Sequence, residues 1–187
     1  MTEQPTRETT VRVRQSEDLE ASTEALIKVH STDGYPVEGV DDPQAWLMPT
    51  GLLRAWVGEL DGKVVGHVLI TTPQDGDAAA KAWADEGNPV ERIAVLGRLF
   101  VLPEARRHSL GKQLVRATSA YADEQGLRLV LDVMEKDTAA IRIYERLGWR
   151  RIGTTLHDSG RGEDIPAYCY VRPAKSESET ERRMTDE

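Results

Sequence analysis

The chain is short of cysteine, and this shortage excludes two kinds of stabilisation. Cys169 is the single cysteine among 187 residues, so the chain can build neither a disulfide framework nor a thiolate metal site of its own. Its four histidines are scattered and lack the spacing that metal ligands need. The sequence therefore predicts a protein without a bound metal.

Basic charge and long apolar runs are also scarce. Lys and Arg together number 24 against 32 Asp and Glu, which gives a net charge of -8 and disfavours nucleic-acid binding through a basic face. The sequence shows no secretory signal and no apolar run long enough to cross a bilayer. We expect a cytoplasmic protein that binds neither nucleic acid nor membrane.

The composition predicts one folded domain between two tails. A hydrophobic content of 39% suffices for one sizeable core. Residues 1–9 are polar without periodicity and residues 174–187 are almost free of apolar side chains, so both are expected to be flexible. Residues 10–173 are expected to form the domain, as a monomer or homodimer.

The hydrophobic pattern predicts a mixed α/β order of elements. Strands are expected over residues 10–14, 53–60, 63–71, 93–102, 127–134, 149–156 and 165–171. Helices are expected over residues 16–30, 43–48, 109–124 and 137–147. Asp42 and Asp137 are the expected N-caps of the second and last helices, and Asp61-Gly62 predicts a hairpin turn. Residues 76–86 form either an inserted helix or a mobile segment, whose Trp83 would belong to a lid.

The most informative stretch is residues 99–111, where an apolar strand, a basic turn and a helix start follow one another. Basic side chains gather in this turn of an otherwise acidic chain. A helix N-terminus there would bind phosphate oxygens, although a solvated basic turn is the alternative interpretation. The glycine-rich loops of nucleotide-binding motifs are absent, since Gly111-Lys112-Gln113 lacks the Ser or Thr of a P-loop, and the three glycines of a dinucleotide fingerprint are missing.

Two motifs carry a family resemblance. Arg106–Gly111 resembles the Gln/Arg-x-x-Gly-x-Gly/Ala cofactor motif of the GNAT family of N-acetyltransferases. Asp137–Trp149 is similar to that family's Asn-x-x-Ala-x-x-x-Tyr-Glu-x-x-Gly-Phe motif, and the order of elements from Val11 to Val171 matches as well. The resemblance implies a GNAT fold. That fold is a mixed, mostly antiparallel sheet of about seven strands, flanked by about four helices and splayed between strands four and five.

The resemblance implies an enzyme that transfers the acetyl group of acetyl-CoA directly to an amine. We expect the acceptor to be a primary amine of a small molecule. A peptide or protein N-terminus or lysine is one alternative acceptor. A non-catalytic acyl-CoA-binding regulatory module is the alternative from another functional class.

The resemblance also assigns site residues by position. The backbone of Leu99, Phe100 and Val101 would hold the pantetheine and the acetyl carbonyl. The pyrophosphate would be bound by the backbone N–H groups of Arg107, His108, Ser109, Leu110, Gly111 and Lys112, and Arg106 would flank this loop. Tyr144 would contact the cofactor and protonate the departing thiolate, although the same pattern is also typical of a core aromatic residue.

Two residues depart from the family pattern. Ser109 replaces a usual glycine, which costs about 1–2 kcal/mol if the backbone needs a positive φ; alternatively, its hydroxyl donates to a phosphate. Asp137 replaces a usual asparagine. It belongs to the implied cofactor-binding set, and it keeps the capping role while adding negative charge near an anionic cofactor.

The proton acceptor and the acceptor pocket are less defined. Asp132 lies where the ribosomal-protein alanine acetyltransferases, which belong to the same family, have a glutamate. A carboxylate in so apolar a strand is costly unless it has a partner, so Asp132 is the candidate base, with a structural hydrogen-bonding role as the alternative. His67 and Glu91 are further candidates. Tyr35 and Trp46 are the expected walls of the pocket, since family members build it from the first two helices and their loop.

Overall fold

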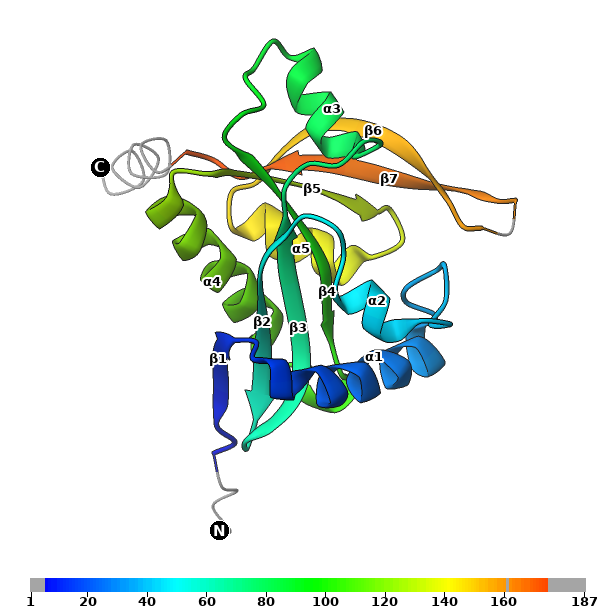
Figure 1. Cartoon of the computed structure of the whole chain (residues 1–187), viewed down its shortest axis with the longest axis vertical. Coiled ribbons are helices and arrows are strands. Elements are labelled where there is room, and N and C mark those ends of the chain that lie inside the picture. The colour runs from blue at the N-terminus through cyan, green and yellow to red at the C-terminus, as the bar shows by residue number, and fades with distance from the viewer. Residues whose placement is uncertain (1–5, 161, 175–187) are drawn as a thin grey trace. The chain divides into compact units, whose positions relative to one another are not determined.

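The computed structural model describes residues 6–160 and 162–174, in which the chain forms seven strands and five α-helices (Figure 1). The strands are β1 (Thr9–Val13), β2 (Leu52–Leu60), β3 (Lys63–Thr71), β4 (Ile93–Val101), β5 (Arg128–Met134), β6 (Arg150–Asp158) and β7 (Asp164–Val171). The helices are α1 (Leu19–Asp33), α2 (Pro43–Leu47), α3 (Ala78–Asp85), α4 (Leu110–Gln125) and α5 (Thr138–Arg146). No helix in these described ranges has both the length and the apolar character that a membrane span requires.

The seven strands form one sheet in the order β1-β2-β3-β4-β5-β7-β6. β4 and β5 are parallel and pair only where Ile93–Val95 faces Arg128–Val130, whereas β1 with β2, β5 with β7 and β6 with β7 are antiparallel. Beyond Val95, β4 continues without a β5 partner in this register. The predicted mixed sheet and its splay between the fourth and fifth strands are therefore confirmed.

The described residues fall into two compact units. The first is formed within Met1–Leu69 and Arg98–Thr118, and the second within Ile70–Gly97 and Ser119–Glu187. The prediction of one domain over residues 10–173 stays a prediction. The predicted tails lie largely outside the described residues, although Thr9 already belongs to β1.

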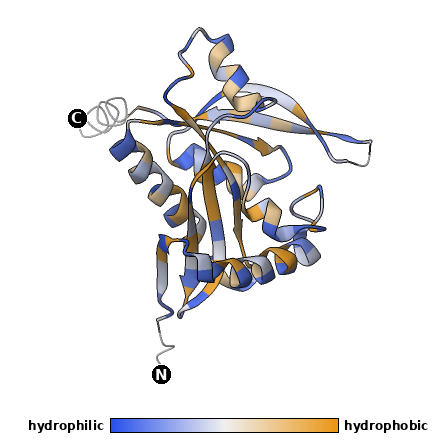
Figure 2. Ribbon diagram, viewed as in Figure 1, coloured by the Kyte–Doolittle hydropathy of each residue, from blue (hydrophilic) through white to orange (hydrophobic). Residues whose placement is uncertain are grey.

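The first unit contains the hairpin that the sequence predicted. Asp61 and Gly62 have φ angles of 51° and 81°, the left-handed pair that a two-residue hairpin turn requires. β3 is buried along most of its length, as expected for a central strand. Figure 2 shows apolar colouring concentrated on the central strands and mixed colouring of α1 and α4, which matches helices with one buried face.

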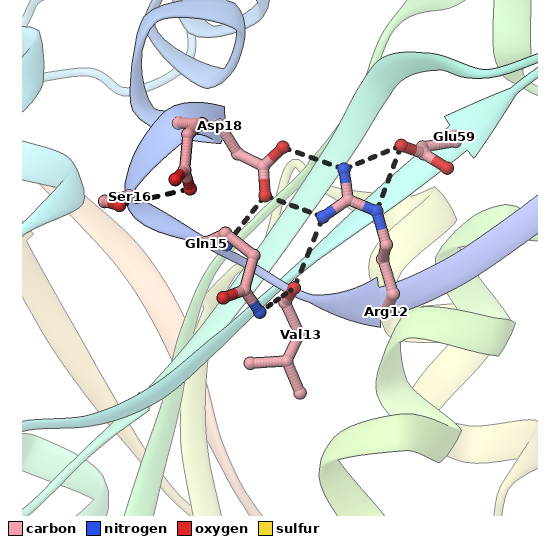
Figure 3. A network of polar contacts seen from close by, with 7 residues as sticks. Arg12, Val13, Gln15, Ser16, Asp18 and Glu59 are labelled. Carbon is pink, nitrogen blue, oxygen red and sulfur yellow. Dashed lines mark hydrogen bonds and ion pairs between the residues drawn. The ribbon is translucent and has the colours of Figure 1, made fainter.

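A buried acidic side chain positions the start of α1. The predicted start at Ser16 is a 3-10 turn over Ser16–Asp18, and α1 itself begins at Leu19. Arg12 lies between Asp18 and Glu59, with its guanidinium donating to the Asp18 carboxylate at 2.7 and 2.8 Å (Figure 3). These bonds lower the pKa of Asp18. Asp18, bonded through Arg12 to Glu59, therefore joins β1 and β2 to the start of α1. Its negative charge also interacts favourably with the helix dipole.

The second unit incorporates the segment that the sequence left open. Ala79 and Trp83 of α3 are buried with side chains of β4, β5 and β7, and α3 contacts β5, β6 and β7 (Figure 1). The Trp83 indole donates to the Pro89 carbonyl at 3.0 Å. The suggestion of a lid was wrong, because the apolar face of α3 belongs to the core of this unit.

The last two strands form a long hairpin in the second unit (Figure 1). Its register pairs Arg150 with Val171 at one end and Asp158 with Asp164 at the other. β6 therefore continues two residues beyond the predicted end at Leu156, and His157 lies on the strand.

Candidate active site

A helix N-terminus forms the first part of the site, in the first unit. β4 ends at Val101, a 3-10 turn follows over Pro103–Ala105, and residues 106–109 lead into the 16-residue helix α4. Leu110 and Leu114 are buried and hold the helix to the core of the unit. Arg106, Arg107 and Ser109 remain exposed, so the positive end of α4 faces solvent beside basic side chains, as anion binding requires.

The backbone before α4 adopts the positive φ that the sequence analysis named as costly for Ser109. Ser109 has φ +56° and Arg107 has φ +71°, both in the left-handed region, where a side chain costs about 1–2 kcal/mol relative to glycine. A left-handed residue directly before a right-handed helix can turn its N–H group toward the same side as those of the first helical turn. These donors and the charges of Arg107 and Lys112 fit a pyrophosphate group.

Two side chains hold this loop in place, and the sequence interpretation missed one of them, Gln113. Gln113 donates from its amide to the His108 carbonyl at 3.2 Å. Arg106 contacts the Asp33 carboxylate and donates to the Val101 carbonyl at 3.2 Å. The Arg106 side chain thus flanks the loop, as expected, and joins it to α1 and β4.

A histidine relay fixes the backbone of β4 just before Leu99–Val101. Arg14 lies 2.9 Å from Nε2 of His67, and Nδ1 of His67 lies 2.9 Å from the Arg98 carbonyl oxygen. Because a guanidinium only donates, Nε2 must accept and Nδ1–H must donate. Arg98 has φ +55°, so the relay holds a left-handed residue within the strand.

The same contacts argue against His67 as the base. Complete burial lowers the pKa of His67 to about 3, against the partly opposing hydrogen bond to Arg98. Both ring nitrogens are used in the relay, so His67 is neutral and engaged near neutral pH. Glu91, the third candidate, is an exposed residue of the segment before β4.

Tyr35 and Trp46, which the sequence analysis predicts as pocket walls, lie together. Their rings are 5.8 Å apart and nearly perpendicular, and the Trp46 ring is 6.3 Å from Phe100 and 5.0 Å from the Arg98 guanidinium. The Trp46 indole donates to the Glu38 carboxylate at 2.7 Å. The first unit therefore has an aromatic surface that includes Phe100 of β4, with an acidic and a basic side chain in contact with Trp46.

Tyr144 lies in the second unit and is buried at 3% exposure. Its ring centroid is 5.3 Å from that of Trp149 and 6.3 Å from that of Tyr170, and its carbonyl accepts from the Trp149 N–H at 3.0 Å. Burial raises the pKa of Tyr144 well above its ordinary value, and the charges of Asp137 and Asp132 raise it further. The phenol is therefore protonated near neutral pH and can act as a proton donor.

The two acidic candidates of this unit differ from expectation in different ways. Asp137 occupies the N-cap position of α5, but its side chain makes no capping hydrogen bond, so the predicted capping role is wrong for the side chain. The Asp132 carboxylate contacts Nε2 of His157. The costly carboxylate of β5 therefore has a partner, which the sequence interpretation did not identify because it ended the strand before His157.

The predicted residues divide between the two units. The first unit brings together Leu99–Val101, the loop and helix start 106–112, Tyr35 and Trp46. The second brings together Asp132, Asp137 and Tyr144. Across the described residues, no group of three His, Cys, Asp or Glu side chains is placed to hold a metal ion.

Comparisons with known proteins agree with this geometry. The model of the "Acetyltransferase (GNAT) family" matches residues 19–149. A mycothiol acetyltransferase of Salinispora arenicola is 46% identical over 116 residues, which cover 59% of this chain and 37% of that protein. The chain spans about a third of the length of the curated relatives it matches.

Solved structures share the fold at low sequence identity. An acetyltransferase of Salmonella typhimurium with acetyl-CoA has a TM-score of 0.66 at 17% identity, over 87% of this chain and 92% of that one. The ribosomal-protein-S18-alanine N-acetyltransferase of Escherichia coli has a TM-score of 0.64 at 17% identity, over 89% and 94%. With the family model matching most of the chain, this protein belongs to the GNAT family of acetyltransferases.

Proposed function

We propose that this protein transfers the acetyl group of acetyl-CoA to a primary amine of a small molecule. The observation that carries the proposal is Tyr144, a buried phenol held protonated in a chain of the GNAT family. Several matched relatives are named "mycothiol acetyltransferase", and a solved structure of the fold contains acetyl-CoA. Both names favour this cofactor and a small acceptor.

The loop before α4 is the proposed binding site of the cofactor pyrophosphate. The N–H groups of the left-handed turn and of the first turn of α4 would donate to phosphate oxygens, and Arg107 and Lys112 would supply positive charge. Ser109 would add its hydroxyl as a donor. The relay from Arg14 through His67 keeps Arg98 in its left-handed conformation, which orients the backbone of Leu99–Val101 toward the role of holding pantetheine and the acetyl group.

Acetyl-CoA supplies an activated acetyl group on a thiolate leaving group. A thiolate gains from a nearby proton donor as the carbon–sulfur bond breaks, and the Tyr144 phenol carries the proton that this step needs. An ammonium acceptor must lose a proton before it can attack. Asp132 is the proposed destination of that proton, directly or through the histidine that it contacts.

Tyr35 and Trp46 are the proposed walls of the acceptor pocket. Their edge-on rings, with Glu38 and Arg98 close by, provide an apolar surface with charged groups that would orient a polar amine. We also propose that the protein acts in the cytoplasm as a monomer or homodimer. Gel filtration with light scattering measures the oligomeric state.

The deciding experiment measures free thiol release from acetyl-CoA with a panel of small amines, peptides and proteins. We expect turnover with a small amine, and a loss of at least tenfold, about 1.4 kcal/mol of barrier, in Tyr144→Phe. Phe keeps the ring contacts with Trp149 and Tyr170, so unchanged acetyl-CoA binding by calorimetry serves as the control. Turnover with peptides alone would assign a peptide or protein acceptor instead. Tight binding without turnover over the whole panel would indicate a regulatory module and refute the proposal.

A further inference from the structure

Arg14, which directly follows β1 in the first unit, is a half-buried cation with only neutral hydrogen-bond acceptors among the described residues. Its Nη1 donates to the Leu47 carbonyl at 2.8 Å and lies 2.9 Å from Nε2 of His67. Its Nη2 lies 2.9 Å from the sulfur of Met48. A carbonyl, an imidazole and a thioether therefore surround the guanidinium, and none of them carries a negative charge.

The charge of Arg14 is not neutralised by a direct ion pair within the described part of the chain. Arg12, two residues earlier, has both Asp18 and Glu59 as ion-pair partners. Burial lowers the pKa of Arg14, against the partly opposing charge of Asp18, because a half-buried position disfavours the charged form. The Asp18 carboxylate is itself bonded to Arg12 (Figure 3). A ligand anion would thus stabilise the Arg14 guanidinium where the protein supplies no anion in contact with it.

The register of β1 shows which face of the sheet Arg14 occupies. Gly58 faces α4, because a Cβ at this position would lie 2.9 Å from the Leu110 side chain. Val11 pairs with Gly58 and so faces α4 as well. Side chains alternate along a strand, and Arg14 comes three residues after Val11, so it faces away from α4. This is the face on which its guanidinium meets the end of α2.

Direct contacts join Arg14 to the aromatic residues of the proposed acceptor pocket. The His67 ring, which lies against the guanidinium, stacks on Phe100 with 5.3 Å between ring centroids and an interplanar angle of 17°. The Phe100 ring is 6.3 Å from that of Trp46. Trp46 also directly precedes Leu47, whose carbonyl accepts from Arg14. The guanidinium and the aromatic surface are therefore linked twice, through the rings and through the end of α2.

The two ends of the guanidinium differ in what holds them. Nη1 is fixed by the Leu47 carbonyl and by His67, in partly buried contacts. Nη2 has the sulfur of Met48, a side chain that is 53% exposed. A thioether is a weak hydrogen-bond acceptor, so a carboxylate that replaced it would gain a stronger, charge-assisted bond. The fixed end orients the group, and the exposed end is open to exchange of its acceptor.

We propose that Arg14 binds a carboxylate of the acceptor, which makes the acceptor an amino acid or a similar amine that carries a carboxylate. This inference rests on the proposed acetyl transfer and its acceptor pocket, and it names the substrate class. The planar guanidinium offers parallel N–H donors that match the two oxygens of a carboxylate. The rings of Trp46 and Tyr35 would contact the apolar part of the same molecule.

A structural role is the other explanation of Arg14. Leu47 is the last residue of α2, and a cation interacts favourably with a helix C-terminus. Loss of that role would displace the end of α2 and affect every acceptor alike. Carboxylate binding predicts instead a loss that is confined to acceptors with a carboxylate, so the two explanations differ in a measurable way.

The experiment compares amino acids with their amides on the whole chain. L-leucine and L-phenylalanine are assayed beside leucinamide and phenylalaninamide, which keep the amine and the side chain but lack the negative charge. We expect Arg14→Gln to lower kcat/KM about 10- to 100-fold for the amino acids, mainly through KM, and to leave the amides within a few-fold. The ratio of variant to wild type cancels the different basicity of the two classes. Arg14→Lys, which keeps the charge but loses the planar donors, should show an intermediate loss.

Arg116→Gln is the matched control, and a competition assay on the wild type removes any dependence on how the variants fold. Arg116 is an exposed residue of α4, so its variant loses the same charge and should keep the wild-type rates with both acceptor classes. In the wild type, 3-phenylpropionate should compete with the amine acceptor about tenfold more strongly than 3-phenylpropionamide does.

Three results would overturn the assignment of Arg14. They are equal losses with amino acids and amides in Arg14→Gln, equal inhibition of the wild type by the acid and its amide, and turnover of simple amines without turnover of any amino acid. A wild-type protein that turns over no amine at all would instead refute the proposed function.

Discussion

The buried His67 makes stability depend on pH in a way that can be measured. The folded protein holds this ring neutral, with its pKa lowered to about 3 by complete burial, whereas in the unfolded chain an imidazole titrates near 6.5. Between these values the unfolded chain binds a proton that the folded protein does not bind. Acid therefore favours unfolding, and the stability that is fully present above about pH 7 is lost progressively as the pH falls from about 6.5 toward 3.

The size of the effect follows from the same two values. At pH 5 the unfolded state gains about 2 kcal/mol from protonating His67, because the unfolded ring is then mostly charged and the folded ring is not. His67→Gln cannot titrate and removes this contribution. It also weakens the relay between Arg14 and the Arg98 carbonyl, at a cost of about 1–3 kcal/mol that does not depend on pH.

Urea unfolding at pH 7.5 and pH 5 tests this reasoning. The variant should be less stable than the wild type at pH 7.5. The difference between their free energies of unfolding should be smaller by about 2 kcal/mol at pH 5. The difference between the two proteins cancels the other titrating groups that they share. His108→Gln, which changes a partly exposed loop histidine outside the relay, is the matched His-to-Gln variant measured beside it. If the variant and the wild type differed in free energy of unfolding by the same amount at both pH values, a neutral His67 ring with both nitrogens hydrogen-bonded would be refuted.

Two further predictions concern the loop and α3. Ser109→Gly should raise the free energy of unfolding by up to about 1 kcal/mol, because glycine adopts the observed φ of +56° without strain. Ser109→Val should lower the free energy of unfolding. Chemical denaturation measures both variants, and a stabilising valine would contradict the left-handed conformation. Trp83→Ala should lower the free energy of unfolding by about 3–5 kcal/mol, because the ring is buried beside β4, β5 and β7 and its indole is hydrogen-bonded to Pro89. Thermal unfolding measures that loss, and a variant with unchanged stability but altered turnover would restore the lid interpretation.

The element order was predictable because each element carries its own local pattern. The alternation of residues 10–14, the Asp61-Gly62 turn and the spacing of Leu110 and Leu114 depend on neighbours within a few residues. Boundaries were less predictable, because a strand or helix end is decided by its partner. β6 extends to Asp158 because it pairs with β7 as far as Asp164, and nothing within the segment itself signals that pairing.

The partners of buried charges were not predictable from one sequence. Arg12 meets Glu59 and Arg14 meets His67 at separations of 47 and 53 residues, distances over which periodicity carries no information. A partner for Asp132 could be expected on physical grounds, since an unpaired carboxylate is costly in an apolar strand. Its identity depended on the register of two later strands.

Asp137 illustrates how a structure changes the meaning of a departure from a family pattern. From the sequence, its negative charge is a liability beside an anionic cofactor, offset by a helix cap. The side chain makes no capping hydrogen bond, so the cap offers no compensation. Burial raises the pKa of Tyr144 most, and the charges of Asp137 and then Asp132 raise it further. In the proposed reaction the Asp137 charge favours the protonated phenol and lowers its acidity, so Asp137 would affect proton donation by Tyr144 as well as the binding of an anionic cofactor.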